Sequence, residues 1–319
     1  MSLSIVIPTT ASRFSIFKTI DSVYNSIPNS GVKIEVVVNK LNNDRNVLER
    51  LKLDPRIELR FQSEIHQTAE ASAIWAAYTS TSEWIWLLGD DDLATAGSVN
   101  HVLDLLKYKD VDFWLLNVLL VFSSVPLEYY RIGPKSIQMC SAHKLWERCG
   151  FFSILTTISC FLLKRSVIDI ELFDEFHEIQ GVYSHSFSLL AMLRKSQVGA
   201  TDYFCVTRNE EVAENIAESL SNYTNFKNVD LNYIWTTGAE ELFDLLSEKI
   251  EIPVSELMNY REIELRKNSN NSYLKSSDIE ILVSRSHSVM DRFKAENAQS
   301  TKSLNAEELI FSAPVRISL

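Results

Sequence analysis

Apolar and polar positions along the first 110 residues form blocks that predict strands and helices in turn. Short apolar runs, typical of strands buried on both faces, lie between segments whose apolar positions recur every three or four residues. The predicted strands are 3–8, 33–38, 56–61 and 84–88, and the predicted helices are 14–27, 44–53, 67–80 and 95–108. This alternation predicts an α/β fold with a mostly parallel sheet flanked by helices.

The rest of the chain changes character twice. Between 111 and 215 the pattern is mixed, with strands expected at 112–122, 158–164 and 202–207 and helices at 142–149 and 183–195. Beyond 216 charged helical periodicity dominates, at 232–248, 253–266 and 276–297, with a polar linker at 267–277. We therefore expect three parts, namely 1–112, 113–215 and a helical C-terminal extension at 216–319.

Composition and charge narrow the class of protein. The chain has 319 residues, a formal net charge of −11 and 46% hydrophobic residues, which is ordinary for a soluble protein. The acidic balance argues against a nucleic-acid partner. The longest apolar runs, such as 113–122, are shorter than the roughly 18–20 residues of a membrane-spanning helix. Peripheral membrane contact stays open.

The N-terminus and the cysteines suggest a location. No basic leader followed by a cleavable apolar core opens the chain, so we expect no signal peptide. The four cysteines follow no metal-binding or CxxC spacing, which predicts free thiols in a reducing cytoplasm. They are Cys140, Cys149, Cys160 and Cys205.

Three acids, Asp90, Asp91 and Asp92, directly follow the apolar strand 84–88. Packed carboxylates resist ionising together, and a divalent cation removes that conflict. Mg²⁺ and Mn²⁺ favour one or two carboxylates plus phosphate oxygens from a ligand. Ligands of open α/β sheets bind at the carboxyl ends of strands, so a metal bound to a diphosphate is predicted here. The alternative is a solvated turn in which one Asp caps the next helix.

At this point the chain resembles a known family. The segments LSIVIPTT (3–10), VVVN (36–39) and EWIWLLGDDDLATAG (83–97) are similar to the inverting GT-A glycosyltransferases of family 2. The most similar branch is the abequosyltransferase-like one, which acts in bacterial surface-polysaccharide assembly. The resemblance covers about residues 1–215 and implies a GT-A (Rossmann-like) fold. The nucleotide-sugar-binding half would be 1–112 and the acceptor-binding half 113–215.

The resemblance also implies substrates and a reaction. The donor would be a UDP, dTDP, CDP or GDP sugar, and the cofactor Mn²⁺ or Mg²⁺. The hydroxyl of a saccharide or undecaprenyl-linked acceptor would attack directly, with inversion at the anomeric carbon. Such an enzyme would work in the cytoplasm, at times peripherally at the inner face of the membrane.

Carried over by position, the resemblance assigns roles to residues of the donor site. Asn39 stands where the family usually has an Asp near the base and ribose. Asp90 matches the first acid of the family's DxD motif and would face the ribose or metal, and Asp92 matches the last acid and would hold the metal and diphosphate. Arg13 is placed to meet a phosphate, unless it is only a surface arginine at a helix start. The remaining donor-site residues would be Pro8, Thr9, Thr10 and Asp91.

The catalytic base departs from the family pattern. The family's base is usually an Asp in an acidic pair shortly after a Gly-Phe-Asp-Glu-like turn. Here that turn reads LFDE at 172–175, and the segment 181–195 after it contains no acidic pair. We expect His185 to serve, because an imidazole is a competent base near neutral pH, with Glu178 and His177 as rivals.

Three alternatives stay open. If none of these residues is the base, the chain is a weak or inactive relative that binds sugar nucleotides or acts as a scaffold. A haloacid dehalogenase-type phosphohydrolase is disfavoured, since its acids would follow the first strand. The apolar faces of the C-terminal helices would pack on the catalytic part or on a second subunit, which would make a homodimer.

Overall fold

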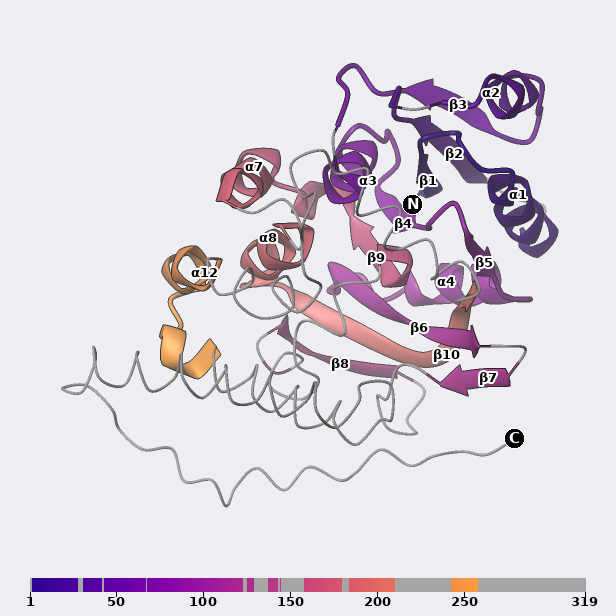
Figure 1. Cartoon of the computed structure of the whole chain (residues 1–319). Helices are drawn as coiled ribbons and strands as arrows, with labels where there is room; N and C mark the ends of the chain where they lie inside the picture. Colours follow the sequence, from indigo (N-terminus) through magenta and orange to yellow (C-terminus); the bar gives the residue numbers. More distant parts are fainter. Residues whose placement is uncertain are drawn as a thin grey trace.

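The computed structural model describes residues 2–27, 31–41, 43–66, 68–122, 125–128, 137–142, 144, 158–179, 184–209 and 242–257. This part of the chain forms one ten-stranded sheet flanked by helices (Figure 1). The strand order is β3-β2-β1-β4-β9-β6-β10-β5, with β7 paired to β6 and β8 to β10. The predicted α/β class with flanking helices is confirmed.

The first half of the sheet is parallel, as predicted. Its strands are β1 (Leu3–Thr9), β2 (Val32–Val38), β3 (Glu58–Phe61) and β4 (Trp84–Leu87), and its helices are α1 (Ser15–Ser26), α2 (Arg45–Lys52) and α3 (Ala69–Tyr78). Asp44 and Thr68 cap α2 and α3 by accepting backbone N–H groups, which satisfies donors that a helix start leaves open. The carboxyl ends of these four strands therefore meet at one edge.

The second half is mixed rather than parallel. Antiparallel β9 lies between β4 and β6, and β5 runs antiparallel to β10, whereas β6 and β10 are parallel. The elements are β5 (Asp92–Ala94), α4 (Ser98–Leu105), β6 (Phe113–Phe122), β7 (Val125–Glu128), β8 (Ile137–Ser141), η1 (Ile158–Cys160), β9 (Phe161–Lys164), η2 (Arg165–Val167), α7 (Ile170–Ile179), α8 (Ser184–Leu193), β10 (Gln197–Asn209) and α12 (Phe243–Ile250).

Three expectations need correction. Asp92 begins β5, so Asp90 and Asp91 alone occupy the turn after β4. A three-residue strand is too short to show a periodicity, and its partner strand lies more than a hundred residues away in the sequence. The LFDE segment at 172–175, expected as a turn, lies inside helix α7. The strand expected from 158 begins at Phe161, after the 3-10 turn η1.

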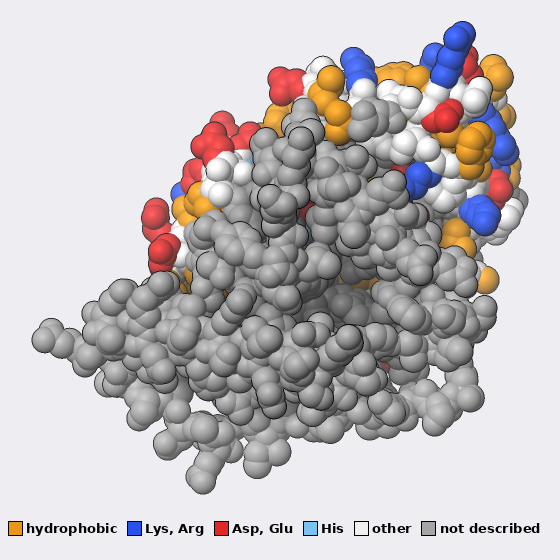
Figure 2. Space-filling view, in the orientation of Figure 1, with side chains coloured by type: hydrophobic (Ala, Val, Ile, Leu, Met, Phe, Trp, Pro, Cys, Tyr) orange, Lys and Arg blue, Asp and Glu red, His pale blue; other side chains and the backbone are white. Residues whose placement is uncertain are grey.

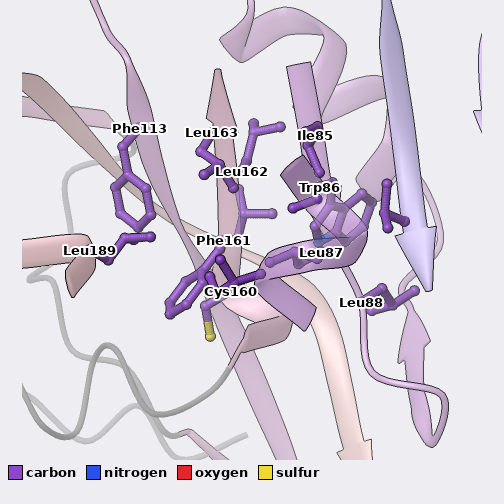
Figure 3. Close-up of a cluster of buried hydrophobic side chains, with 14 of the residues drawn as sticks. Ile85, Trp86, Leu87, Leu88, Phe113, Cys160, Phe161, Leu162, Leu163 and Leu189 are labelled. Carbon is purple, nitrogen blue, oxygen red and sulfur yellow. The ribbon is translucent and has the colours of Figure 1, made fainter. Parts of the chain in front are cut away.

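The centre of the sheet is a tightly packed apolar core. Ile85 and Trp86 from β4 lie beside Leu162 and Leu163 from β9, with Phe161 in the same cluster (Figure 3). All five are fully buried, and burying a side chain of this size stabilises the fold by about 1.5–3 kcal/mol each. Because β9 belongs to the second half of the chain, this core joins the two halves rigidly.

A buried polar network lies near the amino end of β1 and joins it to β2 and β3. The carboxylate of Glu35 on β2 accepts hydrogen bonds from the hydroxyls of Ser4 and Ser80 and pairs with Arg60, whose Nη2 is 2.5 Å away. Ser4 is the second residue of β1, so this network lies away from the carboxyl edge. The network therefore contains a buried hydrogen bond from a serine to a carboxylate, Ser4 to Glu35, that lies away from the acidic turn.

Beyond 216 the structure describes only residues 242–257, which contain α12. This helix packs on α8, where the ring centroids of Phe243 and Phe187 are 5.6 Å apart, so it lies against the preceding part of the chain, which is one of the two arrangements expected. No helix in the described ranges is long and apolar enough to span a bilayer. Cys205 is a buried free thiol, as predicted. Several expectations lie outside the described residues: Cys149, helix 142–149 beyond 144, most of 232–248 and 253–266, and everything after 257.

Candidate functional site

The end of β1 is shaped around the hydroxyl of Thr9. That hydroxyl donates to Oδ2 of Asp90 over 2.5 Å and accepts from the backbone N–H of Ala11 over 2.9 Å. Ala11 has a positive φ of 51°, a conformation that costs a residue with a Cβ about 1–2 kcal/mol. Its carbonyl accepts from the N–H of Asp44 over 3.0 Å, which helps to hold the bend. The bend places Thr9 where it orients the first acid.

Each of the three acids has a different partner. Asp90 accepts from Thr9, and Asp91 forms an ion pair with Arg13, whose Nη1 lies 3.4 Å from Oδ2 of Asp91. Asp92 is only 5% exposed, and its Oδ2 accepts the hydroxyl hydrogen of Ser159. The structure thus brings Thr9, Arg13 and the acids together, in environments that differ from one acid to the next.

The carboxyl group of Asp90 is electrostatically frustrated. Burial, and then repulsion from the Asp91 carboxylate, raise the pKa of Asp90 to about 6, while the Thr9 hydrogen bond and the charge of Arg13 act in the opposite direction. A cation bound beside Asp90 would relieve this conflict. The arrangement therefore has the electrostatic character of a cation site.

The acids also converge in space. A Cβ built on Gly89 would lie 3.2 Å from Oδ1 of Asp91 and 3.2 Å from Oδ2 of Asp92, so both carboxylates approach the same point. Among the described residues, no group of three or more His, Cys, Asp or Glu side chains forms a metal cage. Two or three carboxylates without further protein ligands fit Mg²⁺ or Mn²⁺, which take their other ligands from phosphate and water. They do not fit a structural zinc site.

The side-chain amide of Asn39 has a structural task. Its Nδ2 donates to the carbonyl of His66 over 2.6 Å, and its Oδ1 accepts from the N–H of His66 over 3.3 Å. The amide offers both a donor and an acceptor, whereas an ionised Asp can only accept and would lose the bond to the carbonyl. This explains why Asn stands where the resemblance implies Asp. Asn39 ties the loop after β3 to the end of β2.

Pro8 and Thr10 lie at the same edge as Thr9. Pro8 lies beyond Val6, the last β1 residue in register with β4, so its missing N–H removes no pair from that ladder. The hydroxyl of Thr10 is 2.8 Å from that of Ser12, and its carbonyl accepts from the amide of Asn43. Both side chains are partly exposed, as a ligand-contacting position requires.

The two base candidates lie in opposite environments. His185 on α8 is 2% exposed; its ring centroid is 6.4 Å from that of Phe161, and its Nε2 is 3.2 Å from the hydroxyl of Ser186. Glu178 is exposed on α7, where Figure 2 shows acidic side chains at the left of the molecule. Burial raises the pKa of the neighbouring Asp174, and the charge of Glu178 contributes in the same direction.

The rival His177 is held by its own surroundings. Its Nδ1 lies 3.0 Å from the hydroxyl of Ser184, and its ring stacks on Phe173 with centroids 5.3 Å apart. These contacts, one with a residue of α7 and one with a residue of α8, fix the orientation of the His177 ring.

One contributor to the site went unpredicted. Ser159 is 67 positions from Asp92, and a lone serine before an apolar strand carries no sequence signal. Arg208, which follows the strand predicted at 202–207, is a candidate from the sequence for reaching the acceptor or the diphosphate. Its backbone lies in register opposite Asp92 on β10, a pairing that depends on the unpredicted β5.

Comparison with known proteins places the fold. No family model matches the chain, and no curated protein does. Among solved structures, S. aureus TarS (residues 1–349) matches with a TM-score of 0.52 at 14% identity, over 86% of this chain and 93% of that one. Its UDP complex gives a TM-score of 0.54 at 12% identity over 86% and 93%, and its UDP-GlcNAc complex 0.53 at 12% over 93% and 92%. The chain therefore shares the fold of TarS, which is a glycosyltransferase fold.

Proposed function

We propose that the protein is a metal-dependent inverting glycosyltransferase, similar to the abequosyltransferase-like branch of family 2. It would move a sugar from a nucleoside-diphosphate donor to a saccharide or lipid-linked acceptor in surface-polysaccharide assembly. The observation that carries the proposal is the edge where Thr9 and Arg13 hold Asp90 and Asp91 beside Asp92. That edge lies on a fold whose solved neighbours include complexes with UDP and UDP-GlcNAc, which makes UDP the first nucleotide to test.

The residues at this edge suit such a transfer. The acceptor oxygen would bond to the anomeric carbon as that carbon's bond to the diphosphate oxygen breaks, and the hydroxyl proton would pass to a base. Asp90 and Asp92 would hold Mn²⁺ or Mg²⁺, which supplies positive charge for the leaving diphosphate. Arg13 would donate to a phosphate oxygen from the same edge, as its present contact with Asp91 allows.

A thermal-shift titration tests the donor site. We expect UDP with Mn²⁺ to raise the melting temperature of the protein more than either does alone, because ligands that bind only the folded state stabilise it by mass action. The same titration with dTDP, CDP and GDP would identify the donor class. If none of the four nucleotides shifts melting in the presence of Mn²⁺, the proposed function is wrong.

For the catalytic base we propose two candidates, His185 and Glu178. His185 could act only if the acceptor reached a ring that the present conformation covers, whereas Glu178 is open to solvent. We expect one of the variants His185→Asn and Glu178→Gln to lower kcat by about 100-fold or more, in the range of general-base catalysis, with donor affinity retained.

The same assay separates an enzyme from a binding protein. A wild-type protein that binds UDP and Mn²⁺ but forms no UDP from a UDP-sugar with any acceptor tested would favour the hypothesis that the protein is a sugar-nucleotide-binding or scaffold protein. The observation that supports a binding or scaffold function is the deep burial of His185.

A further inference from the structure

Ser159 connects the second half of the chain to the acidic turn of the first half. Its hydroxyl accepts from the backbone N–H of Gly89 over 2.8 Å and donates to Oδ2 of Asp92. Its carbonyl accepts from Nε1 of Trp86 over 3.0 Å. Ser159 lies in η1, directly before β9, and has no exposed surface. Both its side chain and its backbone are therefore held in place.

These contacts require a small side chain that is donor and acceptor at once. A hydroxyl provides both functions, whereas Ala provides neither. The surroundings leave little room for rearrangement, since a Cβ on Gly89 would lie 3.3 Å from the Ser159 hydroxyl as well as 3.2 Å from the Asp92 carboxylate. The glycine, the serine and the aspartate thus form one closed arrangement.

The contact bears directly on how Asp92 could bind a cation. A hydrogen bond from a hydroxyl fixes the rotation of a carboxylate and favours its ionised form. Removing a partner that holds a metal ligand in this way typically lowers metal affinity by about 10–100-fold. The bond to Gly89 fixes the turn in which Asp90 and Asp91 follow.

We infer that Ser159 is a positioning residue of the metal–diphosphate site, one that orients the Asp92 carboxylate for a divalent cation. The inference rests on the proposed function. It assigns to η1, the turn directly before β9, a task beyond packing, because η1 carries the group that sets the geometry of the acidic turn. The acceptor half of the chain thereby contributes to the donor site.

The test measures Mn²⁺ binding rather than turnover. Titration of Mn²⁺ in the presence of saturating UDP, followed by the electron paramagnetic resonance signal of free Mn²⁺, gives the affinity directly. We expect Ser159→Ala to weaken Mn²⁺ binding by about 10–100-fold and Ser159→Thr, which keeps the hydroxyl, to restore part of the loss. UDP binding without metal should change far less than Mn²⁺ binding.

Ser4→Ala is the matched control. Ser4 is equally buried and also donates to a buried carboxylate, that of Glu35, but it lies toward the amino ends of the strands. We expect this variant to lose stability and keep its Mn²⁺ affinity. An equal loss of affinity in Ser4→Ala would show that general destabilisation explains the effect, and would overturn the inference.

The outcomes separate the inference from the function beneath it. Wild-type Mn²⁺ affinity in a folded Ser159→Ala protein would overturn the positioning role while the glycosyltransferase proposal stands. Absence of Mn²⁺–UDP binding in the wild type would overturn the proposed function itself. In the double variant Ser159→Ala/Asp92→Asn we expect a loss of Mn²⁺ affinity smaller than the two single losses combined, since Ser159 acts mainly through the Asp92 carboxylate that Asp92→Asn already removes.

Discussion

Asp92→Asn should weaken the joint binding of Mn²⁺ and UDP by more than about 100-fold, because losing a metal ligand exceeds the 10–100-fold typical of losing a ligand's partner. Asn keeps the shape of the side chain and an oxygen that can accept from Ser159, so the turn at Gly89 stays in place. Asp92→Ala would also remove that contact and confuse charge with packing. The Asn variant therefore isolates the carboxylate charge.

Calorimetric titration of UDP with and without Mn²⁺ measures this effect. The control is Asp112→Asn, which removes a carboxylate that pairs with Lys164 over 2.8 Å at the start of β6. We expect the control to bind Mn²⁺ and UDP like the wild type. Wild-type metal-dependent binding by a folded Asp92→Asn protein would rule out Asp92 as a metal ligand.

Asp90→Asn should make the metal-free protein more stable at pH 8 while it abolishes metal-dependent binding. In the fold the pKa of Asp90 is raised to about 6, because burial and the Asp91 carboxylate disfavour its charged form. An unfolded Asp titrates near pH 3.9, so ionising Asp90 costs the folded state up to about 3 kcal/mol. Asn carries no charge and can still accept from Thr9. The charge of Asp90 would then oppose stability, as is common for residues that serve a function.

The sign of the pH dependence follows from the direction of that shift. Between about pH 4 and pH 6 the folded protein holds more protons at Asp90 than the unfolded chain does. The contribution of Asp90 to stability therefore falls as pH rises through this window, and the deficit is complete above about pH 6. The advantage of Asp90→Asn should be largest at pH 8 and vanish near pH 4.

Urea unfolding of both proteins across this range gives the difference in the free energy of unfolding. The exposed Asp110, replaced by Asn, serves as control and should show no such pH-dependent gain. Addition of Mn²⁺ and UDP should stabilise the wild type but not Asp90→Asn. An Asp90→Asn protein that is less stable than the wild type at pH 8 would show that the fold already compensates this charge.

The fold of residues 1–112 was predictable because its signals are local. The apolar runs that form β1, β2 and β4 are buried on both faces. In the helices between them, apolar positions recur every three or four residues, so a short stretch of consecutive residues contains the whole pattern. Asp90 and Asp91 could be placed at the carboxyl edge because parallel strands end on the same side. The capping residues Asp44 and Thr68 obey equally local rules.

The second half resisted prediction because its geometry depends on distant pairings. Strand β9 enters the sheet antiparallel between β4 and β6, and β5 exists only because β10 lies beside it. The base candidate His185 shows the same limit: helical spacing predicted that it lies on a helix, but its burial depends on the elements packed around it.

By itself, then, the sequence determined an α/β N-terminal part and an acidic turn at the end of β4, since both follow from the order of neighbouring residues. Tertiary structure alone decided what holds those acids. Asp92 meets Ser159 across 67 positions, and Asn39 meets the backbone of His66 across 27. Hydrogen bonds between segments form wherever the folded chain brings a donor to an acceptor, and no local periodicity records where that will be.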